Sequence, residues 1–425
     1  MKKLTKLFLI EAGEEKLVAL TLLQSIFIGL PRLFTLTVAS ALFLENYSVQ
    51  NLPYIYLVSS LFVPLVGFIH LFFEKKWAFF KVKIRTLLVL CLISFFFIII
   101  LWSLPNQKWT SFALFIWFDI EYVLTHMVFW SVANRLFTVR QNKRLFGLIG
   151  TGEILTAIIG GFLMPYLVQF MGISNLLFLS LGGLVLAFFN LNLIERSFEP
   201  KVQLSEPQNN IEKNQSFIYF LKNKYFMLIF SIMTYLAYCN YFFVDNIFYY
   251  EVNKYYHNSE QLAVFMGQFL AVVGITNFLF RAFLSGRWMM RFSWLGNMLT
   301  LPFILGINIL LIIIISYFFK ETILLFWLVI LIKLFERILL GSIAYPSYYI
   351  LYKPLPPTIQ SRVQTFAEAI IGPIGGILVG LLLTFLNKFL ELNSVGLSVV
   401  LFVFLLGYCF LVFITNQEHQ KLLAT

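Results

Sequence analysis

Long apolar runs dominate the sequence, and short polar segments separate them. A helix needs roughly 20 mostly apolar residues to cross the hydrocarbon core of a membrane. The pattern therefore predicts an all-α polytopic membrane protein with twelve spanning helices. The first apolar run is too long for a cleaved signal peptide, so we expect it to be retained. The predicted spans are 17–44, 53–73, 84–104, 110–135, 145–169, 175–194, 225–249, 260–284, 293–318, 322–345, 363–387 and 394–415.

The basic residues of the polar segments are distributed unevenly between the two sides of the membrane. With the N-terminus placed in the cytoplasm, the outer segments hold Lys108, Lys254, Lys320 and Lys388, while most other loop lysines and arginines lie inside. Cytoplasmic loops of membrane proteins carry such an excess of Lys and Arg. We therefore expect both termini in the cytoplasm and a location in a bacterial cytoplasmic (inner) membrane.

The longest polar segment, 195–216, divides the predicted spans into two sets of six. We interpret residues 1–194 as an N-terminal six-helix half and residues 217–425 as a C-terminal six-helix half, joined by a cytoplasmic linker. Two such halves are typical of transporters of the major-facilitator type, in which the solute site lies near the membrane midplane.

Composition narrows the class of protein further. Hydrophobic residues make up 60% of the chain and charged residues 12%, against about 45–50% and about 25% in soluble domains. The net charge of +11 comes from 31 Lys and Arg against 20 Asp and Glu. Most of this excess lies in the cytoplasmic segments, which removes the case for a nucleic-acid partner.

The sequence also lacks the motifs of enzymes and metal proteins. No phosphate-binding G-x-x-x-x-G-K-[ST] loop, zinc-binding H-E-x-x-H or nucleophile G-x-S-x-G is present. The three cysteines lie far apart within predicted spans, which excludes a disulfide framework. We expect no enzymatic activity, no cofactor and no metal, and a monomer in the lipid bilayer.

Ionisable side chains within predicted spans are costly, so each is a functional candidate. In span 322–345, Lys333, Glu336 and Arg337 share roughly one helix face and sum to +1, which leaves a cation available for an anion. Arg32, in the first span, adds a cation from the other half. A planar guanidinium can bond two oxygens of a phosphate or carboxylate at once. We therefore predict a central cavity in which Arg32, Lys333 and Arg337 bind an anionic solute.

The acidic side chains of the spans leave a structural alternative open. Arg32 can pair with Asp119 or Glu121, and span 322–345 can neutralise itself, because charges within membranes usually pair. Asp119 and Glu121 are two residues apart and point to nearly opposite sides of a helix. These two, with Glu336 and Asp245, are candidates for charge pairing or, in a proton-coupled transporter, for titration. We interpret His126 as a hydrogen-bonded packing residue.

A weak internal repeat points to a second set of candidates near the cytoplasmic surface. Glu153 and Glu368 are each followed seven residues later by a Gly-Gly pair, and each comes soon after an arginine, Arg144 or Arg362. Glycines at such spacing allow close helix packing in lipid. We predict that the two carboxylates bond nearby arginines and anchor or gate the cytoplasmic side.

Two segments resemble a known family. Segment 129–152 runs from Phe-Trp to Asn134, then Lys143-Arg144-Leu-Phe, then Gly-Thr-Gly, and it resembles the signature of the ATP/ADP translocases of obligate intracellular bacteria and plastids. Segment 352–376, which begins Tyr-Lys-Pro-Leu, is similar to a second motif of that family, with fewer basic residues. The resemblance is closer to bacterial major-facilitator-like proteins related to these translocases. It implies a major-facilitator fold and places Asn134 and Lys143 in the cytoplasmic gate.

Together these features predict a secondary active transporter with alternating access for an anionic organic solute. The resemblance makes a nucleotide of the ATP/ADP type the leading substrate, moved by exchange or with protons. Two alternatives stay open, a membrane sensor or scaffold that uses the same bundle without transport, and a transporter of a lipid or other apolar solute.

Overall fold

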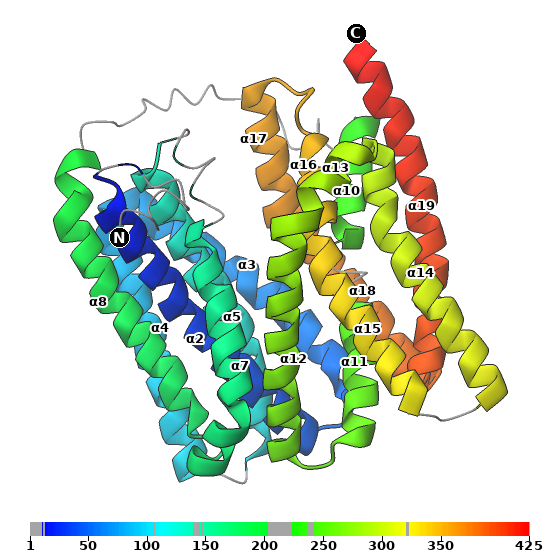
Figure 1. The fold of residues 1–425 in the computed structure, drawn as a ribbon, viewed down its shortest axis with the longest axis horizontal. Coiled ribbons are helices and arrows are strands. Elements are labelled where there is room, and N and C mark those ends of the chain that lie inside the picture. The colour runs from blue at the N-terminus through cyan, green and yellow to red at the C-terminus, as the bar shows by residue number, and fades with distance from the viewer. Residues whose placement is uncertain are drawn as a thin grey trace. The chain divides into compact units, whose positions relative to one another are not determined.

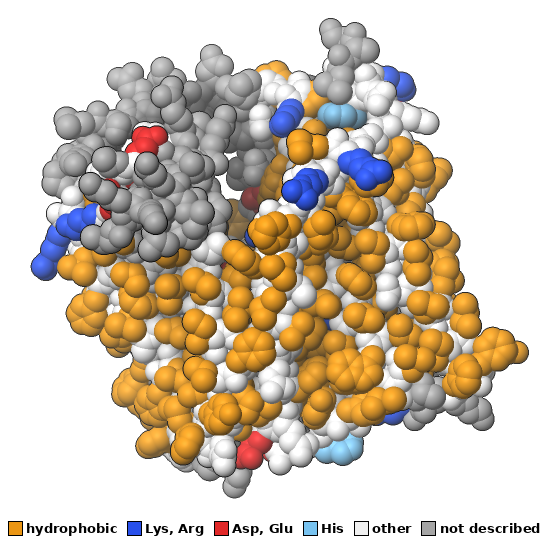
Figure 2. Space-filling view, in the orientation of Figure 1, with side chains coloured by type: hydrophobic (Ala, Val, Ile, Leu, Met, Phe, Trp, Pro, Cys, Tyr) orange, Lys and Arg blue, Asp and Glu red, His pale blue; other side chains and the backbone are white. Residues whose placement is uncertain are grey.

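The computed structural model describes all residues except 1–10, 12, 105–106, 139–140, 142–144, 146–147, 203–222, 237–240, 320–322 and 425. Every element in the described residues is a helix (Figure 1). Among them, ten helices are long and apolar enough to cross a membrane. Figure 2 shows apolar side chains covering the flanks of the helices on one face, with Lys, Arg, Asp and Glu side chains gathered mostly towards the helix ends. The all-α polytopic fold predicted from the sequence is confirmed.

The chain forms two compact units. Segments 48–64 and 257–275 each belong to a different unit from the residues on either side of them in the sequence. Unit 1 comprises residues 1–47, 65–211 and 257–275, and unit 2 comprises residues 48–64, 212–256 and 276–425. The helix α3, Leu52–Lys76, therefore contributes to both units. The division into six-helix halves at 195–216 stays a prediction, and residues 203–222 of that linker lie outside the described residues.

Unit 1 is built around α2, which packs on α5, α7 and α8. Apolar residues, Thr and Ser fill its buried positions, and Pro31 lies inside the helix. Proline is tolerated in membrane helices because neighbouring helices satisfy the freed backbone groups. The helices of this unit are α2 (Glu15–Asn46), α4 (Phe79–Ser103), α5 (Lys108–Leu136), α7 (Thr151–Met171), α8 (Leu176–Val202) and most of α12 (Ser259–Leu279).

Glycines permit the closest helix contacts in unit 1. A Cβ on Gly152 of α7 would lie 2.7 Å from the backbone nitrogen of Ile26 on α2. A Cβ on Gly161 would lie 2.2 Å from the carbonyl oxygen of Gly267 on α12. Small residues therefore bring α7 against two helices at once, as expected for packing in lipid. The sequence analysis interpreted the Gly-Gly pair that contains Gly161 as a packing feature, and these distances confirm it.

Two predicted spans of unit 2 are absent from the ten long apolar helices. The described residues of span 225–249 contain the shorter helices α10 and α11, and span 322–345 contains α15 followed by the π-helical turn η5. These two spans carry four of the candidate ionisable residues. π-helical turns are frequent at functional sites.

The helices of unit 2 pack in pairs. The helix α14 packs on α15 and α19, and α11 packs on α15 and α19. The elements are η1 (Val49–Asn51), α10 (Lys224–Thr234), α11 (Tyr241–Tyr255), η4 (Phe280–Ser285), α13 (Gly286–Arg291), α14 (Trp294–Phe319), α15 (Ile323–Leu339), η5 (Leu340–Ala344), α16 (Tyr345–Ile350), α17 (Pro357–Phe366), η6 (Ala367–Ile371), α18 (Gly372–Phe389) and α19 (Ser394–Ala424).

Candidate functional site

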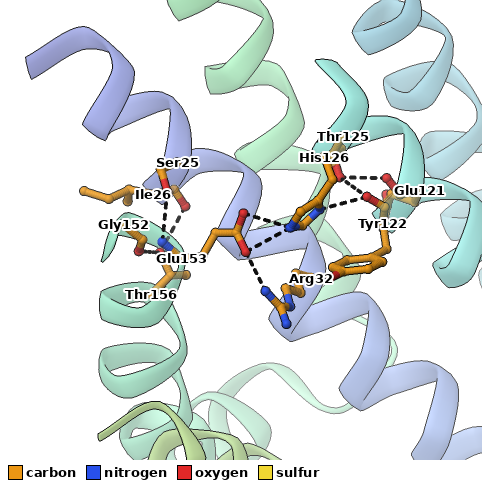
Figure 3. Close-up of polar contacts among 10 residues, drawn as sticks. All are labelled: Ser25, Ile26, Arg32, Glu121, Tyr122, Thr125, His126, Gly152, Glu153 and Thr156. Carbon is orange, nitrogen blue, oxygen red and sulfur yellow. Dashed lines mark hydrogen bonds and ion pairs between the residues drawn. The ribbon is translucent and has the colours of Figure 1, made fainter. Parts of the chain in front are cut away.

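A charged cluster in unit 1 brings together side chains from α2, α5 and α7 (Figure 3). Arg32 projects from α2, and its Nη1 lies 2.5 Å from Oε2 of Glu153 on α7. The guanidinium carbon of Arg32 also lies 5.0 Å from the ring centroid of Tyr122 on α5, within cation–π range. The Arg32 side chain is 42% exposed and that of Glu153 is 10% exposed. The Arg32 guanidinium is therefore partly exposed, while the Glu153 carboxylate that it contacts is mostly buried.

The start of α7 fixes Glu153 against α2. The backbone N–H of Glu153 donates to the Ser25 hydroxyl at 3.2 Å. One turn later, the Thr156 hydroxyl donates to the carbonyl oxygen of Ile26 at 3.0 Å. Glu153 also lies in the first turn of α7, where the helix dipole favours a negative charge. Both the helix terminus and its contacts with α2 hold this carboxylate in place.

The contacts of His126 join α5 to Glu153. Nδ1 lies 2.9 Å from the carbonyl oxygen of Tyr122, which only accepts, so Nδ1 carries a hydrogen. Nε2 lies 3.0 Å from Oε1 and 3.2 Å from Oε2 of Glu153. The His126 ring and the Arg32 guanidinium therefore meet at the same carboxyl group.

A second cluster lies in unit 2, where α15 packs on α11. Lys333 Nζ lies 2.6 Å from Asp245 Oδ1 and 3.0 Å from Glu336 Oε2. The side chains of these three residues are 2%, 8% and 0% exposed, respectively. Arg337 is 29% exposed, and its nitrogens lie 3.9 Å from Asp245 and 3.8 Å from Glu336. Two cations and two carboxylates make this cluster neutral.

The structure thus changes the charge balance expected from the sequence. The sequence predicts one surplus positive charge in span 322–345 because that prediction counts the charges of one helix only. In the structure, Asp245 on α11 lies beside Lys333 and cancels this charge. Arg32 lies against Glu153, and its pairing with Asp119 or Glu121 stays a prediction. Arg32 lies in unit 1, and Lys333 and Arg337 lie in unit 2. A cavity shared by the three cations stays a prediction.

The two acidic residues of α5 differ in environment. Glu121 is 1% exposed, and the Ser94 hydroxyl on α4 donates to its Oε1 at 2.9 Å. Trp117 Nε1 donates in turn to Ser94 Oγ at 3.2 Å. Asp119 is only partly buried. The two side chains therefore lie in different surroundings.

The structure describes only some of the predicted gate residues. Asn134 is exposed at the end of α5, and Lys143 and Arg144 lie outside the described residues. Glu368 is exposed in η6, where Gln364 donates to its Oε1 at 3.0 Å and the Tyr349 hydroxyl at 3.5 Å. Arg362 lies on α17, and nothing is described of its side chain. The gate role of this set stays a prediction.

Sequence reasoning missed two features of unit 1. It treated His126 as a packing residue, whereas the ring bridges α5 to Glu153. It also counted Lys83 only as one of the cations of the cytoplasmic segments, whereas this side chain is 1% exposed and lies 3.0 Å from both Glu74 Oε1 and His70 Nε2. The four-residue spacing of His70 and Glu74, which places both on one helix face, is the signal that could have indicated the second network.

Metal binding has less support than the binding of a charged solute. Among the described residues, no group of three His, Cys, Asp or Glu side chains is placed to hold a metal ion. The chemistry available in both clusters is that of cations and carboxylates, which bind and release charged groups and protons.

Comparison with known proteins identifies the family. Residues 124–380 match the family model described as Major Facilitator Superfamily. The chain belongs to this superfamily. It is therefore an integral membrane transporter of the major-facilitator type, and the family resemblance noted in the sequence is confirmed at that level.

Individual proteins similar to this chain share less than a quarter of their aligned residues with it. The chain is 23% identical over 221 residues to ADP,ATP carrier protein 1 of Chlamydia pneumoniae, a match that covers 46% of this chain and 42% of that protein. Among solved structures, a mutant of the nucleoside transporter NupG has a TM-score of 0.60 at 15% identity, covering 94% of this chain and 98% of that one. A D-xylose-proton symporter has a TM-score of 0.63 at 11% identity, covering 93% and 96%. These structural similarities establish the fold.

Proposed function

We propose that the protein is a secondary active transporter of an anionic organic solute, and that Arg32 binds the negative group of that solute. The observation that carries the proposal is the 42% exposure of the Arg32 side chain beside Glu153 and His126, whose side chains are mostly buried. A cation held within a membrane protein is costly. An anionic solute offsets that cost when it binds, and this favours anions over neutral solutes.

The geometry of Arg32 suits a phosphate or carboxylate. Its guanidinium is held on one side by Glu153 and lies over the ring of Tyr122. A guanidinium has five N–H donors in a planar fork, so the bond to Glu153 does not use its full capacity. A solute phosphate is therefore expected to share Arg32 with Glu153 rather than to displace the carboxylate.

A phosphorylated nucleotide is the leading substrate within this class. Two observations support it: the likeness to a protein named ADP,ATP carrier protein 1, and the motif in segment 129–152. That segment leads directly into α7, whose first turn carries Glu153. The signature segment thus ends directly before Glu153 of the cluster. Transport by exchange or coupled to protons is compatible with this arrangement.

The neutral cluster of unit 2 has a different role in this proposal. Arg337 is partly exposed and is proposed as a second contact for the solute. Lys333 is enclosed by two carboxylates, so its predicted contact with the solute requires one of them to move away. Asp245 and Glu336 are proposed to keep Lys333 charged within the helix bundle.

The remaining predictions are part of the same proposal. The distribution of Lys and Arg supports a topology with both termini in the cytoplasm. The proposal takes the protein to be a monomer in a bacterial cytoplasmic membrane. Glu368 and Arg362, with Asn134, Lys143 and Arg144, are proposed to act at the cytoplasmic gate.

Uptake into proteoliposomes tests the proposal. Purified protein is reconstituted with unlabelled ATP inside, and entry of labelled ATP, ADP, orthophosphate and adenosine is measured from outside. Arg32→Gln removes the guanidinium and Arg32→Lys keeps a positive charge without the fork. Arg287→Gln, at an exposed position on α13, is the matched control for loss of one arginine.

The expected result is uptake of the phosphorylated compounds and little uptake of adenosine. A hydrogen bond to a charged group contributes about 1.5–3 kcal/mol, so Arg32→Gln should weaken the apparent affinity roughly 10- to 100-fold. The apparent affinity of Arg32→Lys should lie between those of Arg32→Gln and the wild type. The apparent affinity of Arg287→Gln should match that of the wild type. Equal uptake by Arg32→Gln and wild-type protein would remove Arg32 from the site. If no phosphorylated compound enters, the nucleotide proposal is wrong.

A further inference from the structure

Glu121 is enclosed by the helices of unit 1 without a cation beside it. Its side chain is 1% exposed. Its Oε2 is buried and has no hydrogen-bond partner among the described residues. Within the same set of residues, no ion pair joins Glu121 to Lys, Arg or His. A carboxylate in this position differs in kind from the paired acids of the two charged clusters.

Comparison with the acids of the two charged clusters and with Glu74 shows the difference. Glu153 contacts Arg32 and His126, and Asp245 and Glu336 both contact Lys333. Glu74, which is partly buried, contacts Lys83. Each of these carboxylates has a cation within 3.0 Å, which offsets the cost of burying a negative charge.

The surroundings of Glu121 offer hydroxyl groups in place of a cation. The helices packed on α5 are α2, α4 and α8. Away from the helix ends, the described ionisable groups on these three are Arg32, which bonds Glu153, and Cys91, a thiol on α4 that faces Glu121. On α5 itself, His126 bonds Glu153 and Asp119 is partly buried. The charged residues nearer the ends of the packed helices include Lys83, Arg85, Glu195 and Arg196.

The hydrogen bonds around the carboxyl group show which oxygen is available for a proton. Trp117 Nε1–H only donates, so Ser94 Oγ accepts from it and directs its own hydrogen to Glu121 Oε1. Oε1 is therefore the accepting oxygen. The other oxygen, Oε2, is left to carry a hydrogen. The Thr35 hydroxyl on α2, 2.7 Å from the Ser180 hydroxyl on α8, is a further polar neighbour of this carboxyl group.

We propose that Glu121 is a proton-binding site, protonated on Oε2 in the conformation described here, and that release of this proton accompanies transport. Burying an ionised carboxylate without a cation costs several kcal/mol or more, so the neutral acid is the stable form in this environment. When water or a cation reaches the site, the proton leaves and one negative charge remains on Glu121. The proton comes from water on one side of the membrane and returns to water on the other.

Infrared difference spectroscopy tests the proton without any solute. Reconstituted wild-type protein at neutral pH should show the carbonyl stretch of a protonated carboxylic acid, and Glu121→Gln should lose it. The matched control is Glu153→Gln, which removes a paired carboxylate and should leave the band in place. Ser94→Ala should keep the band but shift it to higher frequency, because the hydrogen bond to Oε1 is lost. An unchanged band in both Glu121→Gln and Ser94→Ala would overturn the proposal, and Ser94→Ala decides alone if Glu121→Gln does not fold.

The coupling role rests on the proposed transport function and has its own test. Labelled ATP is offered to proteoliposomes with and without an imposed pH gradient. Glu121→Gln should lose any accumulation driven by the gradient yet keep exchange of labelled for unlabelled ATP. If the variant still responds to the gradient as the wild type does, Glu121 does not couple proton movement to transport. If wild-type protein moves no ATP at all, the transport proposal fails while the infrared result still decides whether Glu121 binds a proton.

Discussion

Removing Lys333 should destabilise the protein through the carboxylates that it leaves behind. In Lys333→Met, Asp245 and Glu336 stay buried at 8% and 0% side-chain exposure, and the cluster changes from neutral to one net negative charge. Breaking a buried ion pair from one side typically costs about 3–5 kcal/mol. Arg337 is close enough to both acids to compensate in part, so we expect about 3 kcal/mol.

A second substitution should restore much of that loss. Asp245→Asn added to Lys333→Met returns the cluster to neutrality, with Glu336 and Arg337 as the remaining charges. Replacing both partners of a buried pair is often close to neutral, whereas removing one is not. The double variant should therefore recover at least about half of the loss. Its stability would exceed that of Lys333→Met although it departs further from the natural sequence.

Thermal unfolding in detergent, followed by tryptophan fluorescence at one heating rate, measures the effect. For a compact unit of 150–250 residues, each kcal/mol shifts the unfolding midpoint by about 2–4 °C. Lys333→Met should therefore unfold roughly 6–12 °C below the wild type. Lys388→Gln, at an exposed position of the same unit, is the control and should unfold with the wild type. A double variant no more stable than Lys333→Met would refute the charge-balance reasoning.

Three further predictions concern unit 1. Gly161→Val should destabilise the protein by about 1–3 kcal/mol in thermal unfolding, because its Cβ would lie 2.2 Å from a carbonyl oxygen of α12. The control Gly182→Ala should have nearly the stability of the wild type, because a Cβ there would meet no atom within 4 Å. Tyr122→Leu removes the ring beside the guanidinium and should weaken apparent affinity for labelled ATP about two- to fivefold in proteoliposome uptake; unchanged affinity would exclude a contribution from the ring. Lys83→Met should lower the unfolding midpoint more than Lys81→Gln, because Lys83 is buried and Lys81 is exposed; equal midpoints would contradict this.

Much of the fold follows from local pattern, but its π-helical turns do not. Apolar runs of sufficient length predicted the long helices, because a membrane span needs only length and apolar composition. Span 322–345 has an equally continuous apolar pattern, yet α15 ends at Leu339 and the π-helical turn η5 follows. The ionisable residues of this span were recognised as candidates from the sequence. That they come just before a π-helical turn was evident only in three dimensions.

The candidate site was predicted in its residue types and not in its pairings. Arg32, Asp245 and Lys333 stood out because charges within spans are rare and costly. Glu153 was assigned by an internal repeat to a gate beside Arg144, whereas its described partners come from α2 and α5. Spacing within one helix gives the face on which a side chain lies. It gives no information about which face of another helix lies opposite.

The sequence by itself determined that this is a polytopic helical membrane protein with a few costly charges in its spans, because hydrophobic length and charge placement are local properties of a chain. The tertiary structure decided which charges cancel. It brought Asp245 to Lys333 and Glu153 to Arg32, and it placed a hydroxyl group rather than a described cation beside Glu121. The energy of a buried charge depends on what lies within a few ångströms of it, and those neighbours come from helices far apart in the sequence.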